Sequence, residues 1–237
     1  MGKITVKHYL NTNLKPYIIR GENYYSMYIM VVVNRKNTKV KSISFEELYT
    51  EKDFEDILSD SDSLLTQEIA VIEKICSLIQ EVLGDFDTTF FSAYYSLMKD
   101  IFIDSVDFES CAHRDFNIWD TAHRNNKMGL AIESFVFGDF SLSINKTHGM
   151  DMFTWYSPAG QEKLFDYLKE ENIQGDIFQI ILMINKLVFL GSMEAFSLKL
   201  HETKKGRELY EKYSEIIDND FWRYFETVQE EYENVDN

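Results

Sequence analysis

The sequence of 237 residues contains few of the residues that cross-link a chain or break its secondary structure. Its two cysteines, Cys76 and Cys111, both lie in apolar stretches. This number fits a reducing compartment better than a disulfide-rich secreted protein. Two prolines and ten glycines leave little sequence of the linker type. We therefore expect buried free thiols and long uninterrupted helices.

Long hydrophobic runs are also missing. The most apolar stretch, 177–190, has 14 residues and contains Asn185 and Lys186. A helix that crosses a bilayer needs about 20 apolar residues, so this stretch is expected to be a buried core helix. The first residues alternate polar and apolar side chains and have no apolar core like that of a signal peptide. We therefore predict a cytoplasmic protein without a membrane partner.

Basic residues are scarce beyond position 42. The chain carries 24 Lys and Arg against 40 Asp and Glu, a net charge of −16. Residues 1–42 nevertheless contain eight basic residues and one acid, Glu22 (+7), so the other 195 residues hold 16 basic and 39 acidic side chains (−23). Such an asymmetry is more informative than the total. Two alternatives stay open: the basic segment docks on its own acidic helices, or its outer face meets phosphates.

The sequence contains no Gly-rich phosphate loop, Gly-x-Ser-x-Gly elbow, His-Glu-x-x-His motif or paired-cysteine motif. Cys111, His113 and His123 are close in sequence, but their spacing is not that of zinc ligands. We therefore predict no metal site and no cofactor, and the sequence gives no reason to predict an enzyme.

The first 44 residues have the pattern of a small antiparallel sheet. Residues 3–10 alternate polar and apolar side chains, and His8 lies on the apolar face. Residues 24–33 are apolar on both faces, which predicts the central strand. After a turn at 34–37, residues 38–44 alternate again. A histidine on an apolar face is expected to be a hydrogen-bonded core residue and not a ligand.

The rest of the chain has helical periodicity. A capping box at Ser44 and Glu47 predicts a helix from Phe45 to Leu58. Gly84 should end the next helix, and Ser157-Pro158 should start a later one. The expected helices are 45–58, 64–83, 88–103 with a buried aromatic stripe (Phe90, Phe91, Tyr94, Tyr95), 128–146, 158–171, 177–201, 203–217 and 219–233.

These elements predict an α+β fold, with a small three-stranded antiparallel N-terminal sheet followed by a mainly α-helical body. The expected domains are a basic sheet over 1–45 and an acidic helical body over 46–237. A further boundary near 105–150 is an alternative.

The stretches TVKHYLNTNLKP (5–16) and YYSMYIMVVVNRKNTKVKS (24–42) resemble the N-terminal arm-type DNA-binding region of tyrosine integrases from Bacteroidetes phages and transposons. In that family a short three-stranded sheet binds DNA ahead of a helical core-binding domain. The stretch DFDTTFFSAYYSLMKD (85–100) is similar to the helical segments that follow such arms. The resemblance implies a DNA-binding sheet from a mobile element.

The catalytic residues of that family are not found. Tyrosine recombinases hold the scissile phosphate with an Arg and a His-x-x-Arg box, and a Tyr near the C-terminus attacks it. In this chain neither His113 nor His123 has an Arg three residues later. Tyr224 and Tyr232 lie near the end, but in acidic segments that would repel phosphate. No catalytic role is therefore carried over.

We expect a non-catalytic DNA-binding protein that resembles the arm and core-binding part of a mobile-element integrase, with double-stranded DNA as its partner. Arg35 is the candidate for contacts with base edges. The residues predicted to contact nucleic acid are Lys3, Lys7, Arg35, Lys36, Lys39 and Lys41. The alternative is an acidic helical protein-interaction module with a protein partner and no nucleic-acid role. Pairing of Lys39, Lys41 and Arg35 with helix carboxylates would favour that alternative.

Overall fold

A computed structural model of the chain describes residues 3–59, 64–98, 156–170, 176–182, 184–186, 189, 200–201 and 203–216. The chain forms two compact units. The first comprises Met1–Lys99 with Tyr156–Pro158, and the second comprises Asp100–Trp155 with Ala159–Asn237. The predicted boundary at residue 45 falls inside the first unit, so the sheet shares a compact unit with the helices that follow it. The alternative boundary near 105–150 lies outside the described residues.

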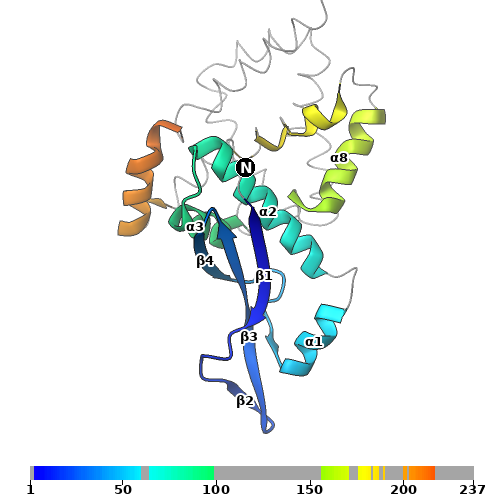
Figure 1. Ribbon diagram of the computed structural model, residues 1–237, viewed down its shortest axis with the longest axis vertical. Helices are drawn as coiled ribbons and strands as arrows, with labels where there is room; N and C mark the ends of the chain where they lie inside the picture. Colours follow the sequence, from blue (N-terminus) through cyan, green and yellow to red (C-terminus); the bar gives the residue numbers. More distant parts are fainter. Residues whose placement is uncertain are drawn as a thin grey trace, which may run out of the picture. The chain divides into compact units, whose positions relative to one another are not determined.

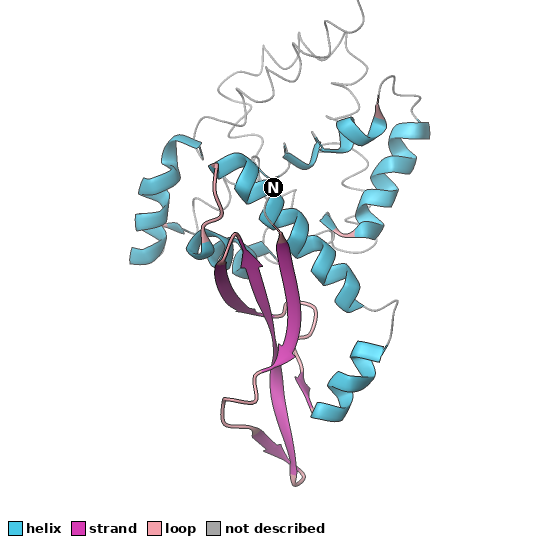
Figure 2. Cartoon of the chain, in the orientation of Figure 1, coloured by secondary structure: helices cyan, strands magenta, loops and turns pink. Residues whose placement is uncertain are grey.

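The N-terminal sheet is an antiparallel meander with β3 (Glu22–Val33) in the middle, as Figures 1 and 2 show. The strands β1 (Ile4–Leu10) and β4 (Lys36–Lys41) both pair with the second half of β3. Two short strands that the sequence did not predict, β2 (Tyr17–Ile19) and β5 (Leu48–Tyr49), pair with its first half. The α+β class with an N-terminal antiparallel sheet is confirmed.

Two tight turns bound β3. The turn before it is Arg20–Gly21, with φ of 52° and 87°, and the turn after it is Asn34–Arg35, with φ of 51° and 67°. Two central residues with positive φ make a type I′ turn, whose twist matches that of the flanking strands. Asparagine and glycine adopt this conformation readily, whereas it costs about 1–2 kcal/mol for a residue with a longer side chain. Arginine is therefore an unfavourable residue at both turns.

The helix α2 (Leu64–Leu83) has the predicted bounds, and Gly84 follows it with a φ of 75°. This is the left-handed conformation that ends many helices. The helix α3 (Thr88–Met98) starts where predicted, because the Asp87 carboxylate accepts hydrogen bonds from the backbone N–H groups of Thr89 and Phe90, at 2.8 and 2.9 Å. Its predicted end at 103 lies outside the described residues.

The predicted capping box at Ser44 and Glu47 is wrong. The helix α1 spans Glu51–Ser59. It is capped by Thr50, whose hydroxyl accepts from Asp53 N at 3.1 Å while the Asp53 carboxylate accepts from Thr50 N at 2.9 Å. The N–H of Ser44 instead donates to the Glu68 carboxylate, 3.0 Å away. A partner distant in sequence therefore takes the group that the capping box would have used.

The core of the first unit lies between one face of the sheet and the helices α2 and α3. The helix α2 contacts β1, and α3 contacts β4. The predicted aromatic stripe of α3 is buried, and Cys76 is a buried free thiol, as expected. The fully buried side chains of this core include Met27, Ile29, Val31, Val33, Ile72, Ile75, Cys76, Ile79, Phe90, Phe91 and Tyr94. Each large one contributes about 1.5–3 kcal/mol to folding.

Beyond residue 155 the described parts are helical. The helix α8 (Pro158–Glu170) begins at the predicted Ser157-Pro158 start. Residues 177–182 and 184–186 and residues 204–216 are helical, in agreement with two further predicted helices. The side-chain amides of Gln161 and Asn185 exchange two hydrogen bonds, at 3.0 and 2.8 Å.

The helices predicted over 128–146 and 219–233, together with Cys111, His113 and His123, lie outside the described residues. Among the helices that the structure describes, none has the length and apolar character needed to cross a membrane.

Candidate nucleic-acid interface

The face of the sheet that points away from the core of the first unit is called the outer face. None of its side chains is buried. In the strand register, Met30 lies between Lys7 and Lys39, and Tyr28 lies between Tyr9 and Lys41. The outer face consists of Thr5, Lys7, Tyr9, Tyr28, Met30, Val32, Asn37, Lys39 and Lys41, all exposed or half-buried. It thus presents lysines on both outer strands around an apolar and aromatic centre.

The outer face contains no acidic side chain. The Lys39 Nζ lies 5.6 Å from the centroid of the Tyr9 ring, close enough for a cation–π interaction. The rings of Tyr9 and Tyr28 are 6.1 Å apart, and partial burial, followed by the proximity of Tyr28, raises the pKa of Tyr9. The Tyr9 ring is therefore neutral at physiological pH, and the charged side chains of the outer face are its lysines.

The predicted contact residues separate into two groups. Lys7, Lys39 and Lys41 lie on the outer face, Lys3 is exposed just before β1, and Arg35 is exposed in the turn between β3 and β4. Within the described part of the chain, these five residues form no ion pair. The structure therefore brings Lys7, Lys39 and Lys41 together on one face, where Lys39 also contacts the Tyr9 ring.

Lys36 is the exception. The two-residue turn starts β4 at Lys36, which places this side chain on the face opposite to Lys39 and Lys41. Its Nζ donates to the Phe86 carbonyl oxygen at 2.9 Å and pairs with the Asp85 carboxylate. Hydrogen bonds from Lys36 and from Phe86 N hold the pKa of Asp85 below its ordinary value. Lys36 thus ties the sheet to the loop between α2 and α3.

Sequence reasoning missed Glu68, the residue that fixes the sheet on the helices. Its carboxylate is fully buried and accepts five hydrogen bonds. One oxygen lies 2.7 Å from His8 Nε2 and 2.6 Å from Ser42 Oγ. The donors to the other oxygen are Ile43 N, Ser44 N and the Tyr95 hydroxyl, at 2.9, 3.0 and 2.7 Å.

Burial alone would raise the pKa of Glu68, but the hydrogen bonds from His8, Ser42, Tyr95 and the backbone outweigh it and leave the pKa lowered. Glu68 is therefore ionised at neutral pH, and His8 must donate its Nε2 proton. His8 is thus a buried core histidine hydrogen-bonded through Nε2, as predicted, while its buried Nδ1 has no hydrogen-bond partner among the described residues. A signal was available in the sequence, because Glu68 stands on the same helical face as Ile72 and Ile75, as a lone acid in an apolar stripe.

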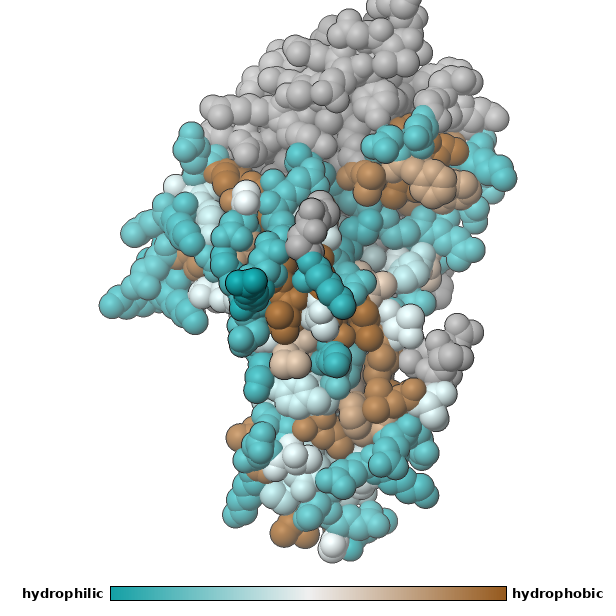
Figure 3. All heavy atoms as spheres, in the orientation of Figure 1, coloured by the Kyte–Doolittle hydropathy of each residue, from teal (hydrophilic) through white to brown (hydrophobic). Residues whose placement is uncertain are grey.

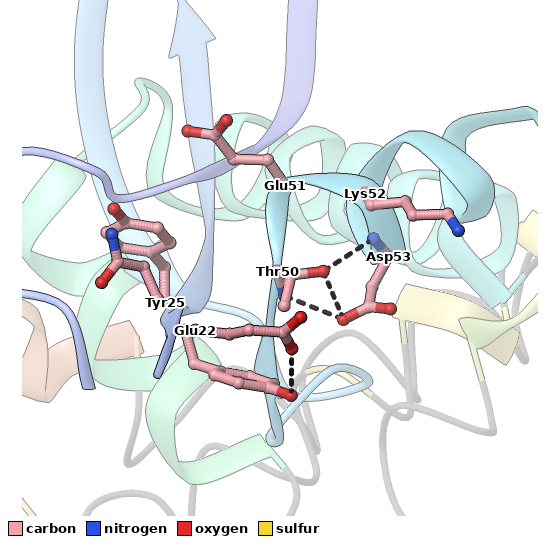
Figure 4. A pocket seen from close by; sticks show the side chains of 8 residues that line it. Glu22, Tyr25, Thr50, Glu51, Lys52 and Asp53 are labelled. Atoms are coloured by element: carbon pink, nitrogen blue, oxygen red, sulfur yellow. Dashed lines mark hydrogen bonds between the residues drawn. The ribbon is translucent and has the colours of Figure 1, made fainter. Parts of the chain in front are cut away.

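A surface pocket of about 470 Å³ lies between the start of β3 and the N-terminus of α1 (Figure 4). It is lined by Glu22, Asn23, Tyr24, Tyr25, Thr50, Glu51, Lys52 and Asp53. Three of its four charged side chains are acidic, and Asp53 already caps α1. Among the residues that the structure describes, no group of three His, Cys, Asp or Glu is placed to hold a metal ion. The carboxylates would repel a phosphate, so the outer face is the better candidate for nucleic acid.

Comparison of the chain with protein-family models, with curated proteins and with solved structures finds no match in any of the three. The resemblance to integrase arms stays a prediction.

Proposed function

We propose that the protein is a non-catalytic DNA-binding protein whose outer face contacts double-stranded DNA. The observation that carries the proposal is the grouping of Lys7, Lys39 and Lys41 on a face without acidic side chains, unpaired within the described residues. Lysines placed in this way neutralise phosphates and release counterions, which provides most of the affinity for DNA.

The dimensions of the sheet are compatible with this partner. Neighbouring strands are about 4.8 Å apart, so three strands span roughly 10 Å. The major groove of DNA is about 12 Å wide and admits a narrow β-ribbon. In this proposal Lys3, Lys7, Lys39 and Lys41 contact phosphates, and Arg35, at the exposed turn, reaches base edges. The net charge of −23 on the remainder of the chain limits DNA contact to the basic segment.

The proposal also includes a cellular compartment and a genetic origin. We place the protein in the cytoplasm, where the Cys76 thiol stays reduced, and we assign it to a mobile element on the strength of its resemblance to integrase arms.

The test is fluorescence anisotropy of the full chain with a labelled duplex at about 50–200 mM salt, the range over which such affinities change most. The double variant Lys39→Gln/Lys41→Gln should weaken binding and reduce the slope of log affinity against log salt by about 2, since each lost phosphate contact removes about 0.9. The matched control is Lys204→Gln/Lys205→Gln, which removes the same charge from exposed positions in the second unit. It should leave the slope unchanged. Absence of binding at low salt, or equal slopes for both double variants, would refute the proposal.

A protein-interaction module is the second candidate, and α1 favours it. This helix contains Glu51, Asp53, Glu55 and Asp56, and none of its residues is buried. An exposed acidic helix suits a basic protein surface and not DNA. A full chain that fails to bind duplex at low salt would favour this candidate.

A further inference from the structure

One edge of β3 is open near the start of the strand. The backbone groups of an antiparallel strand point alternately to its two edges. The Ser26 carbonyl oxygen accepts from Asn11 N at 3.3 Å, on the edge of β1, and the Met27 carbonyl oxygen accepts from Ser42 N at 3.1 Å, on the edge of β4. Odd-numbered residues of β3 therefore direct their backbone groups toward β4 and β5, and Asn23 is the first of them.

Among the described residues, no strand pairs with β3 on this edge before Tyr25. Tyr25 is paired with Tyr49, the last residue of β5, and the chain then turns into α1. The residues that flank a two-residue turn form a hydrogen-bonded pair, so Glu22 directs its backbone groups to β2, on the other edge. Asn23 therefore points its N–H and C=O into the space that a longer β5 would occupy.

The pocket of Figure 4 lies in this space. Its β3 lining consists of four consecutive residues, 22–25, whose side chains alternate between the two faces of the sheet. Such a lining is expected of a pocket at a strand edge and not of one on a face. The opposite wall is the start of α1, and the volume of about 470 Å³ falls in the range of about 300–1,000 Å³ that ligand sites have. The pocket therefore offers room for an extended chain beside Asn23.

The register predicts which side chains such a chain needs on one face. Its residue opposite Asn23 would share a face with Ile18, which pairs with Asn23 and is 70% exposed, and with the half-buried Tyr25. Figure 1 shows β2 and the start of β3 reaching away from α2 and α3, and Figure 3 shows hydrophobic surface at this end of the sheet. An apolar side chain therefore suits this position.

Charge predicts the side chains on the other face. The residues on either side of that apolar one would point toward Glu22, whose carboxylate accepts from the Tyr24 hydroxyl at 3.4 Å. Glu51 and Asp53 add two further acids to the pocket. Hydrogen bonds from the backbone N–H and the hydroxyl of Thr50 lower the pKa of Asp53, which therefore stays ionised. Lysine or arginine suits these positions.

We propose that the open edge of β3 at Asn23 binds an extended segment of a partner protein, which adds a strand beyond β5 and alternates apolar with basic side chains. Main-chain hydrogen bonds to Asn23 provide affinity, and the alternation provides specificity. The site does not depend on the DNA-binding function. Asn23 is five residues from Tyr28, which pairs with Lys41, so it lies about 17 Å along β3 from the nearest lysine of the outer face.

The experiment titrates the full chain with a synthetic peptide in which Val and Lys alternate, and follows backbone amide exchange by NMR. Bound peptide should slow exchange of the Asn23 N–H about tenfold or more, because this group becomes part of a ladder. The Glu22 N–H already faces β2 and should change little. A peptide in which Val and Glu alternate should not bind, because the acids of the pocket repel it.

Two variants test the backbone and the charge separately. Asn23→Pro removes the N–H at the open edge and keeps the pairing with β2, since proline is tolerated where the N–H faces away from the sheet. It should weaken binding of the Val-Lys peptide about tenfold. Glu22→Gln/Glu51→Gln should also weaken it and make it less sensitive to salt. The matched control, Glu211→Gln/Glu215→Gln, changes exposed residues of the second unit and should bind like the wild type.

The outcomes separate this site from DNA binding. No binding of the Val-Lys peptide up to about 1 mM, or equal binding by the wild type and both variants, would overturn the inference and leave the outer-face function intact. A dimer in light scattering that Asn23→Pro abolishes would assign the edge to a second copy of the chain and also overturn it. Peptide binding by a chain that fails to bind duplex would support the inference and refute the proposed function.

Discussion

Removing the Glu68 carboxylate should loosen the whole N-terminal sheet. In Glu68→Ala, five hydrogen-bond donors lose their acceptor. The hydroxyls of Ser42 and Tyr95 can rotate toward other partners, and Ile43 N keeps the Tyr95 hydroxyl oxygen as an acceptor at 3.1 Å, but His8 Nε2 and Ser44 N are left without one among the described residues. A buried donor without a partner costs about 1–3 kcal/mol, so two of them cost about 2–6 kcal/mol. We expect a loss of about 4 kcal/mol, a large share of the ordinary 5–15 kcal/mol stability of a domain.

Glu68→Gln should be much milder. One amide oxygen can still accept from Ile43 N, Ser44 N and Tyr95, while the amide N–H₂ turns toward His8 and Ser42, which then have to accept. Loss of the charge weakens the remaining bonds. The expected cost is about 1–2 kcal/mol. Comparison of the two variants therefore separates the contribution of the carboxylate's shape to stability from the contribution of its charge.

Hydrogen exchange followed by mass spectrometry in peptides from β1 and β3 measures this directly, because exchange of buried strands reports the free energy of opening. At about 1.4 kcal/mol per factor of ten, Glu68→Ala should speed exchange about a thousandfold. Glu73→Gln, an exposed carboxylate on the same helix, is the control and should change stability by at most about 0.5 kcal/mol. If Glu68→Ala accelerated hydrogen exchange in β1 and β3 by less than about tenfold, Glu68 would not be the residue that holds the sheet on the helices.

Acid should destabilise the folded chain by protonating the Glu68 carboxylate. The pKa of Glu68 in the folded chain is lower than its ordinary value of 4.5, so the folded state binds its proton less readily than the unfolded state. The stabilisation is complete above about pH 4.5 and is lost as the pH falls from there toward the lowered pKa. In Glu68→Gln this part of the pH dependence should disappear. Parallel exchange profiles of wild type and Glu68→Gln through this range would contradict the reasoning.

Three further predictions concern single residues. Thr50→Ala removes the cap of α1 and should cost about 1 kcal/mol, seen as faster exchange confined to 51–59; unchanged exchange there would contradict it. Cys76 is buried, and burial raises the pKa of its thiol, so it should resist alkylation until the first unit is unfolded in urea; rapid labelling of the folded chain would contradict the described core. Arg35→Gly removes the cost of a positive φ at this position and should stabilise the β3–β4 turn by about 1 kcal/mol, seen as slower hydrogen exchange in β3 and β4. The same variant should bind duplex DNA more weakly. A loss of stability would show that the turn is not strained.

Elements with local signals could be predicted from the sequence. The helix α2 is long and strongly periodic and ends at a glycine in the left-handed conformation, so its bounds follow from nearest neighbours in the chain. The start of α8 at Ser157-Pro158 is equally local. The meander of β1, β3 and β4 follows from alternation, which also placed His8 on the apolar face of its strand.

Features set by distant partners could not be predicted. Ser44 followed by Glu47 has the pattern of a capping box, but Ser44 N is taken by Glu68, 24 residues away. The strands β2 and β5 are three and two residues long, too short for a periodic signal. The sequence predicted a turn over 34–37, but the turn has only two residues, Asn34 and Arg35, and β4 starts at Lys36. The shorter turn places the Lys36 side chain on the face of the sheet that packs on the helices.

The five hydrogen bonds of Glu68 have a consequence for how the basic sheet can be exchanged between genes. They join positions 8, 42–44, 68 and 95, so the residues that hold the sheet in place are spread over nearly a hundred positions of the chain. A fragment cut at residue 45 would leave the Met27–Val33 stripe bare and would present unprotected strands to other chains, which favours aggregation. Recombination or protein engineering therefore has to move the sheet together with α1, α2 and α3 as a single cassette.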